Sequence, residues 1–259
     1  MSSASLVEIV GFFDALLKVS TTPDYSLALN GLQVEHHGPV VKITSAVDCS
    51  RRTILEAVES RANLLIVHHG LFWGGLLPLT GSFYSRVHLL LQHDIALYSA
   101  HLPLDAHETL GNSRLLSQSL GLTPTAGFAR HETIFCGVRG LDEIDTAELY
   151  ARVRQFSLAH GGSAIASSMA PGRRTRHWAI CSGAGATVNT IREAVDLGVD
   201  TLVVGEGPHW SAVEAEEKGL VIIYAGHYAT ETLGVRALAE AGAERFGLPC
   251  AFIEAPTGL

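Results

Sequence analysis

The stretch Leu64–Gly70 constrains the fold of this chain more than any other, because four apolar residues run directly into His68, His69 and Gly70. A short uninterrupted apolar run is typical of a strand that is buried on both faces of a sheet. The two histidines then lie where the strand leaves the sheet, and open α/β sheets bind ligands at these carboxyl ends. The sequence therefore predicts an α/β fold with a polar site at the end of this strand.

The composition excludes several classes of protein. With 259 residues, 47% of them hydrophobic and 17% charged, the chain can form a well-packed core. Its formal net charge of −8 argues against a nucleic-acid partner, which needs a basic surface. The sequence has neither the ~20-residue apolar stretch of a membrane span nor the pattern of a signal peptide. Four cysteines without a Cys-x-x-Cys pair predict a reduced, cytoplasmic protein.

A strand-helix-strand pattern occurs twice along the chain, with the same order of elements in both copies. The helical segment Ile54–Val58 is matched in the second copy by Ile191–Val195. The repeat predicts two similar α/β lobes, each with a mostly parallel sheet flanked by helices. We expect the first lobe to comprise residues 1–125 and 226–259, and the second to comprise residues 126–225.

Histidines and carboxylates follow buried strands in both halves of the chain, with a His-x-x-x-carboxylate spacing in each. Neutral imidazole and carboxylate ligands together suit Zn, Fe, Mn or Co. A catalytic zinc takes only about three protein ligands, whereas two metals ~3.5–4 Å apart would use the whole set. We therefore expect two divalent metals between the lobes, at the carboxyl ends of the strands. The candidate residues are His68, His69, His101, Asp105, His227 and Glu231.

Each of these residues also has a purely structural explanation. A single histidine at a strand end is more often a hydrogen-bonded structural residue than a ligand. Glu231 could complement a helix N-terminus, and His101 could hold a neighbouring carboxylate in place. Glu206 and His209, at the matching strand end of the second copy, are as compatible with the rim of a pocket as with metal binding, and Asp48 is similarly open. The repeated layout favours a metal site over these separate explanations.

Several motifs span most of the chain: Asn30-Gly31-Leu32-Gln33-Val34-Glu35, Ile66–Gly70 with Phe72-Trp73, His101–His107, Gly111-Asn112, Gly205-Glu206 and Gly226–Glu231. In these motifs the sequence closely resembles the dinuclear-metal proteins called GTP cyclohydrolase 1 type 2 homologs, or NIF-three-like proteins. The resemblance implies a two-lobed α/β fold and a ring-shaped homohexamer. It also implies metal ligation by His68, His69, Asp105, His227 and Glu231, with His101 as a residue of the pocket.

The leading functional hypothesis is a metal-dependent hydrolase, of cyclohydrolase or phosphoesterase type, acting on a nucleotide-like or other small substrate. Metals lower the pKa of bound water toward ~7, and His101 could transfer protons as a catalytic residue. The alternative is a non-catalytic protein that binds or delivers metal, or a ring scaffold whose metals are structural. Turnover that depends on His68 would separate the first hypothesis from the second.

Overall fold

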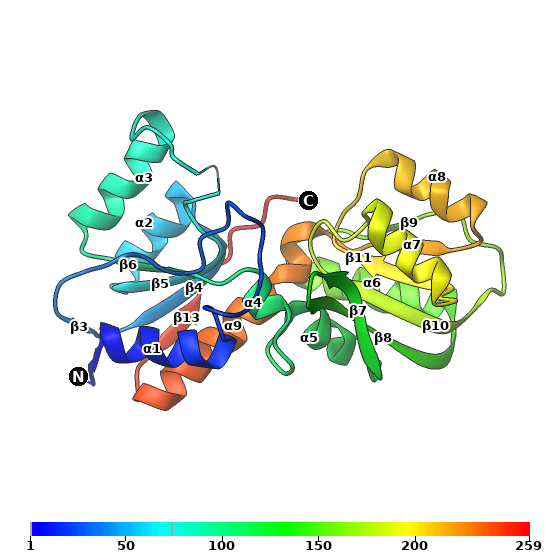
Figure 1. Ribbon diagram of the computed structural model, residues 1–259, viewed down its shortest axis with the longest axis horizontal. Coiled ribbons are helices and arrows are strands. Elements are labelled where there is room, and N and C mark those ends of the chain that lie inside the picture. Colours follow the sequence, from blue (N-terminus) through cyan, green and yellow to red (C-terminus); the bar gives the residue numbers. More distant parts are fainter. Residues whose placement is uncertain (1, 74) are drawn as a thin grey trace. The chain divides into compact units, whose positions relative to one another are not determined.

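The computed structural model describes residues 2–73 and 75–259. The chain forms two compact units: unit 1 comprises Met1–His107 and Gly234–Ala255, and unit 2 comprises Glu108–Leu233 and Pro256–Leu259. Each unit has its own sheet and its own helices, which confirms the expected two-lobed α/β fold (Figure 1). Within the described residues, no helix is both long and apolar enough to cross a lipid bilayer.

Unit 1 contains a five-stranded sheet in which four strands are parallel and the edge strand β2 is antiparallel. The strand order is β13-β4-β5-β6-β2. Its elements are β1 (Ala4–Ser5), α1 (Leu6–Leu17), β2 (Gly31–Val34), β3 (Pro39–Val40), β4 (Ile43–Asp48), α2 (Arg51–Glu59), β5 (Leu64–His69), α3 (Gly81–Gln92), β6 (Ala96–Ser99), α4 (Leu102–Asp105) and β13 (Cys250–Phe252).

The strand β5 is buried on both faces, as its apolar run predicts. Leu65 and Val67 pack in one core cluster with Ile54 of α2 and Leu90 of α3. All four residues of the run, Leu64–Val67, have no solvent exposure. Such a strand is held firmly in place, so the two histidines that complete it have a fixed backbone.

Unit 2 contains a six-stranded sheet in the order β7-β8-β10-β11-β12-β9. Parallel pairing is confined to β10, β11 and β12, whereas β7, β8 and β9 are antiparallel to their neighbours, so this sheet is mixed and not mostly parallel as the repeat predicted. Its elements are α5 (Asn112–Ser119), β7 (Ala126–His131), β8 (Ile134–Asp145), α6 (Thr146–Ala159), β9 (Ile165–Ala166), β10 (Arg174–Cys181), α7 (Val188–Asp196), β11 (Thr201–Val204), α8 (His209–Glu217) and β12 (Val221–Tyr224). The helix α9 (His227–Phe246) begins in unit 2 and ends in unit 1.

The boundary between the units lies earlier in the chain than the predicted boundary at residue 125. The helix α5 accounts for the difference. Its Leu116 packs in the same core cluster as Leu149 and Val153 of α6, and its Ser113 hydroxyl donates to the Cys136 carbonyl oxygen at 2.9 Å. These contacts attach α5 to the second sheet.

The two copies of the repeat begin their helices in the same way. The Ser50 hydroxyl accepts the Thr53 N–H at the start of α2, and the Thr53 hydroxyl accepts the Ser50 N–H in return. Thr187 and Thr190 form the same reciprocal pair at the start of α7. Each pair satisfies two backbone donors that a helix end leaves open. Matching capping boxes therefore fix the strand-to-helix turn in both units.

The helix α9 begins at His227, shortly after the buried strand β12. All residues from Tyr228 to Thr232 are buried, so the first turns lack the alternation of buried and exposed positions that reveals a helix in a sequence. As a result, His227 and Glu231 are neighbours on one face of a helix, because residues four apart in a helix lie one above the other.

Candidate metal centre

Three imidazoles gather at one edge of the first sheet. His68 and His69 end β5, and His101 follows the neighbouring parallel strand β6. The ring centroid of His68 lies 4.9 Å from that of His69 and 4.9 Å from that of His101. One ligand nitrogen from each ring lies within 4.8 Å of the other two. This group could hold a metal ion.

The buried ring of His68 has a defined tautomer. Its Nδ1 lies 2.8 Å from the carbonyl oxygen of Ala100. A carbonyl oxygen can only accept, so Nδ1 carries the proton and Nε2 carries the lone pair of the neutral ring. This Nε2 is 3.5 Å from Oδ2 of Asp105, at the end of α4. His68 and Asp105, both predicted as ligands, are thus brought together within unit 1.

His69 and His101 are oriented in the same way, each by a carboxylate. Nδ1 of His69 is 2.9 Å from Oδ1 of Asp48, its register partner across β4 and β5. Nδ1 of His101 is 2.9 Å from Oδ1 of Asp24. In metal sites, such a partner fixes the ring and directs its other nitrogen toward the metal. Asp48, whose role the sequence left open, is therefore an orienting partner of His69.

Asp24 is a residue that sequence reasoning missed. Its Oδ2 accepts hydrogen bonds from the Asn30 side-chain amide at 2.7 Å and from the Leu102 N–H at 3.0 Å. Burial by itself raises the pKa of Asp24, but hydrogen bonds from His101 and Asn30 and the charge of His101 outweigh it and hold the pKa below its usual value. Only the Asn30-Gly31 motif nearby gave a signal, because Asp24 itself lies in a segment without strand or helix periodicity.

The second unit contributes a histidine between two carboxylates. Nδ1 of His227 is 2.8 Å from Oε1 of Glu206, and its Nε2 is 3.1 Å from Oε2 of Glu231. Burial disfavours the charged ring, but the hydrogen bonds and charges of Glu231 and Glu206 outweigh this and raise the pKa of His227 to about 9. The ring is therefore protonated at neutral pH without metal, and a metal would bind in exchange for that proton. His209 is an exposed residue at the start of α8.

The glycine turn after β10 is shaped to admit Glu231. Gly183 has a φ of +61°, and a Cβ at this position would collide with Oε1 of Glu231. The Gly183 N–H donates to the Thr230 hydroxyl at 3.0 Å, and a Cβ on Gly205 would lie 2.6 Å from the same hydroxyl oxygen. The turn thus packs on the first turn of α9, where even one methyl group would displace the carboxylate.

We expect Gly183→Ala to reduce the free energy of unfolding by more than the strain of a left-handed alanine backbone alone would. A non-glycine residue in the left-handed region costs roughly 1–2 kcal/mol, and overpacking typically adds about 1–3 kcal/mol. Gly198→Ala is the matched control, because Gly198 has a φ of +69° and no neighbour within 4 Å of its Cβ position. Urea unfolding of both variants measures the difference, and equal losses of stability would contradict a tight fit around Glu231.

The donor atoms fit the metals that the sequence predicted. Unit 1 offers three imidazole nitrogens and a carboxylate, and unit 2 offers one imidazole nitrogen and a carboxylate. Sets of nitrogen and oxygen donors of this kind suit Zn, Fe, Mn or Co. Every one of the four histidines also has the orienting hydrogen bond at Nδ1 that metal-binding histidines require.

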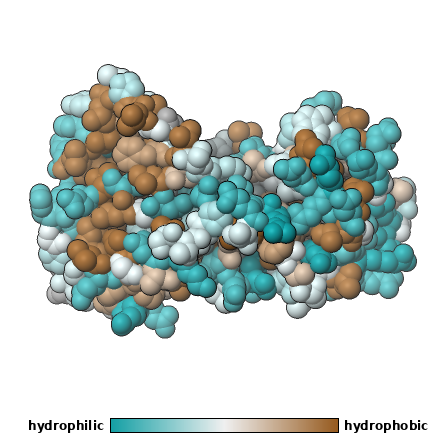
Figure 2. Space-filling model, in the orientation of Figure 1, coloured by the Kyte–Doolittle hydropathy of each residue, from teal (hydrophilic) through white to brown (hydrophobic). Residues whose placement is uncertain are grey.

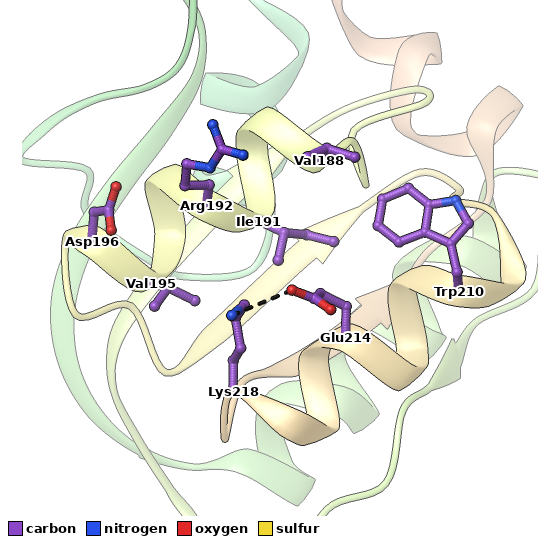
Figure 3. A pocket seen from close by; sticks show the side chains of 8 residues that line it. All are labelled: Val188, Ile191, Arg192, Val195, Asp196, Trp210, Glu214 and Lys218. Atoms are coloured by element: carbon purple, nitrogen blue, oxygen red, sulfur yellow. Dashed lines mark ion pairs between the residues drawn. The ribbon is translucent and has the colours of Figure 1, made fainter.

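A separate cavity of about 380 Å³ lies between α7 and α8 of unit 2 (Figure 3). The Trp210 indole and an ion pair between Lys218 and Glu214, at 3.3 Å, form one side of it. Ile191 and its neighbours on α7 form the other side. The lining residues come from these two helices and from Lys218, which follows α8, and they do not include the candidate donors, so this groove is distinct from the histidine groups.

Comparison with known proteins agrees with this architecture. A model of the Duf34/NIF3 (NGG1p interacting factor 3) family matches residues 4–257. The chain belongs to the Duf34/NIF3 family. This confirms the resemblance identified from the sequence motifs. Within the family, a Deinococcus radiodurans protein named GTP cyclohydrolase 1 type 2 homolog is 38% identical over 97% of this chain and 94% of its own length. A protein of the same name from Halobacterium salinarum is 41% identical, over 97% of this chain and 98% of its own.

Solved structures of other Duf34/NIF3-like proteins share the fold. TTHA1606 from Thermus thermophilus superimposes with a TM-score of 0.85 and 36% sequence identity, covering 98% of this chain and 100% of its own. The protein ybgI, described as being of unknown function, gives a TM-score of 0.88 and 34% identity over 98% of this chain and 100% of its own. The likeness extends over both units of the chain.

Proposed function

We propose that this Duf34/NIF3 protein binds two divalent metals per chain and acts as a metal-dependent hydrolase of a nucleotide-like or other small substrate. The supporting observation is the common orientation of four histidines. Each ring has its Nδ1 bonded to a carbonyl or carboxylate oxygen, so each presents Nε2 as a ligand atom. Metal-binding histidines almost always share this arrangement.

We assign metal ligation to the five residues that the family resemblance implies, and a catalytic role to His101. Bound metals would supply a water of lowered pKa and would polarise the bond under attack. His101 is placed to accept or donate a proton at Nε2, because Asp24 holds its Nδ1 and stabilises the charged ring that results. The proposed ligands are His68, His69, Asp105, His227 and Glu231.

We also propose that the protein is cytoplasmic and forms the homohexamer that the resemblance implies. Its four cysteines include no Cys-x-x-Cys pair, as is usual for a protein of a reducing compartment. Large apolar side chains are exposed on α3 and the loop before it, among them Leu77, Leu79 and Leu91. Figure 2 shows hydrophobic residues gathered over this part of unit 1. Contiguous exposed apolar surface is typical of an interface, and light scattering after gel filtration tests for six copies.

The test of function combines metal analysis with a substrate screen. Purified protein is expected to contain about two Zn, Fe, Mn or Co ions per chain, which is the number that a two-metal hydrolase uses. Metal-loaded protein is expected to hydrolyse a nucleotide or another phosphoester, and treatment with a chelator should abolish the turnover. Metal that exchanges freely without any turnover would instead favour a metal-delivery protein. Protein without bound metal under every purification condition would contradict both functions.

Replacing Asp24 by asparagine is expected to lower kcat/KM about 10- to 100-fold while bound metal is retained, because Asp24 orients the proposed catalytic residue His101 and not a proposed ligand. An amide cannot accept from His101, Leu102 and Asn30 as a carboxylate does, so the His101 ring loses its fixed orientation. Asp142→Asn is the control, because Asp142 hydrogen-bonds only a tryptophan among the contacts described, at 2.8 Å. Steady-state kinetics and elemental analysis measure the two effects, and equal kcat/KM values in the two variants would contradict the catalytic role of His101.

A further inference from the structure

Two aromatic side chains lie against the imidazole of His101. The ring centroid of Trp73 is 4.6 Å from that of His101, with an angle of 87° between the planes, and 5.7 Å from that of His69. The centroid of Tyr25 is 5.8 Å from that of His101. Trp73 is partly exposed, and Tyr25 is 57% exposed. The first histidine group therefore has an accessible aromatic rim.

The two segments that carry these side chains touch each other, and the charged residue next to Tyr25, Asp24, is bonded to His101 with its side chain only 6% exposed. Residues 25–34 and 71–83 include no Asp, Glu, Lys or Arg. The Leu71 N–H donates to Oε1 of Gln33 at 2.7 Å, and a Cβ on Gly75 would lie 3.4 Å from Cδ2 of Leu27. A ligand group that enters this rim would meet apolar and aromatic surface with no counter-charge from residues 25–34 or 71–83.

Such a rim favours a flat, uncharged ring over a charged group. Moving a charge onto apolar surface costs hydration that nothing there replaces. A purine or similar ring, in contrast, has a π face that can stack on an indole or a phenol. The histidine group beside the rim favours an anion instead. Metals bound to its imidazole nitrogens would bind oxygen anions such as phosphate.

We propose that Trp73, together with Tyr25, binds the uncharged planar ring of the substrate and positions its anionic end at the histidine group. The inference rests on the proposed function, since it assumes a ligand that also reaches the metals. Trp73 is here a positioning residue, and it makes the site selective for substrates that carry a ring.

The test compares two probes that differ only in the ring. Guanosine 5′-monophosphate and ribose 5-phosphate share the sugar and phosphate, and only the first carries a base. Metal-loaded protein is titrated with each probe by calorimetry and by tryptophan fluorescence. We expect the nucleotide to quench the fluorescence and to bind at least about 10-fold more tightly than the sugar phosphate, as one base–aromatic stack provides.

Substitutions at Trp73 test whether the indole stacks on the base or only provides apolar volume. Trp73→Leu should lose about 10-fold in affinity for the nucleotide and nothing for ribose 5-phosphate, whereas Trp73→Phe should retain most of the preference. Trp210→Phe is the matched control, because Trp210 is 41% exposed in the separate groove of unit 2. It should leave both affinities unchanged and should retain the quenching.

The inference is overturned by equal affinities of the wild type for the two probes, by no binding of the nucleotide, or by an unchanged preference in Trp73→Leu. Nucleotide binding that depends on Trp73 without turnover of any phosphoester would contradict the proposed hydrolase and support the inference. Equal kcat/KM for the nucleotide and for ribose 5-phosphate would contradict the inference and leave the hydrolase standing.

Discussion

Replacing His68 by alanine is expected to remove bound metal and to lower kcat/KM by more than about 100-fold. That bound follows from the orienting contacts, because losing one of them already costs about 10- to 100-fold, and His68 is a proposed ligand itself. The side chain has no solvent exposure, and its Nε2 lies 3.5 Å from Asp105. Neither water nor a mobile neighbour is therefore well placed to replace the missing nitrogen.

Elemental analysis and steady-state kinetics on the same preparation check this prediction. His93→Ala is the control, because His93 is exposed at the end of α3, away from the three gathered rings. Glu231→Ala should lose metal in the same way as His68→Ala, since both belong to the proposed dinuclear centre. A His68→Ala protein that keeps its metal and its turnover would leave His68 with a purely structural role.

Trp178→Ala is expected to reduce the free energy of unfolding by about 3–5 kcal/mol, as is usual when a large buried aromatic side chain is removed. Trp178 lies in β10 without solvent exposure, and its indole N–H donates to Oδ2 of Asp142 at 2.8 Å. The strands around it are close: a Cβ on Gly140 would lie 2.5 Å from the indole ring. Alanine at this position leaves a cavity and a carboxylate without its donor.

Urea unfolding followed by far-UV circular dichroism measures this loss. Trp210→Ala serves as the comparison, because a side chain that is 41% exposed has less burial to lose. We expect the comparison variant to lose no more than about 1 kcal/mol, in line with substitutions outside the core. A loss below about 1.5 kcal/mol for Trp178→Ala would mean that the second sheet repacks around the space, which buried cavities rarely allow.

Helices and strands with a regular local pattern of apolar residues could be predicted from the sequence. β11 and β12 are short apolar runs, and α6 has helical spacing, so the residues themselves indicate these elements. The strand β7 was not predicted, because Gly127 and the left-handed Ala129, with a φ of 55°, interrupt any alternation of side chains. Its place in the sheet depends on pairing with β8, and the sequence does not reveal such pairing locally.

The candidate site was predictable to a similar degree. His68 and His69 could be found because their strand is an uninterrupted apolar run, and the His227–Glu231 spacing could be found because it repeats His101–Asp105. Asp24 could not, since its hydrogen bond to His101 joins residues 77 positions apart. A single sequence reveals candidate site residues that belong to a local pattern. Their partners at distant positions in the sequence are found only when the fold is known.

The hydrogen bonds at Nδ1 have a consequence for how fast a metal can be captured. A free imidazole interconverts between two tautomers and many ring orientations, and a ligand must wait for the productive one. In His68 and His69 the fold has already selected both, through Ala100 and Asp48. The entropic cost of ordering these rings already falls in the folding step, so metal binding includes less of that cost. In the proposed metal centre, folding therefore arranges these two rings before an ion arrives.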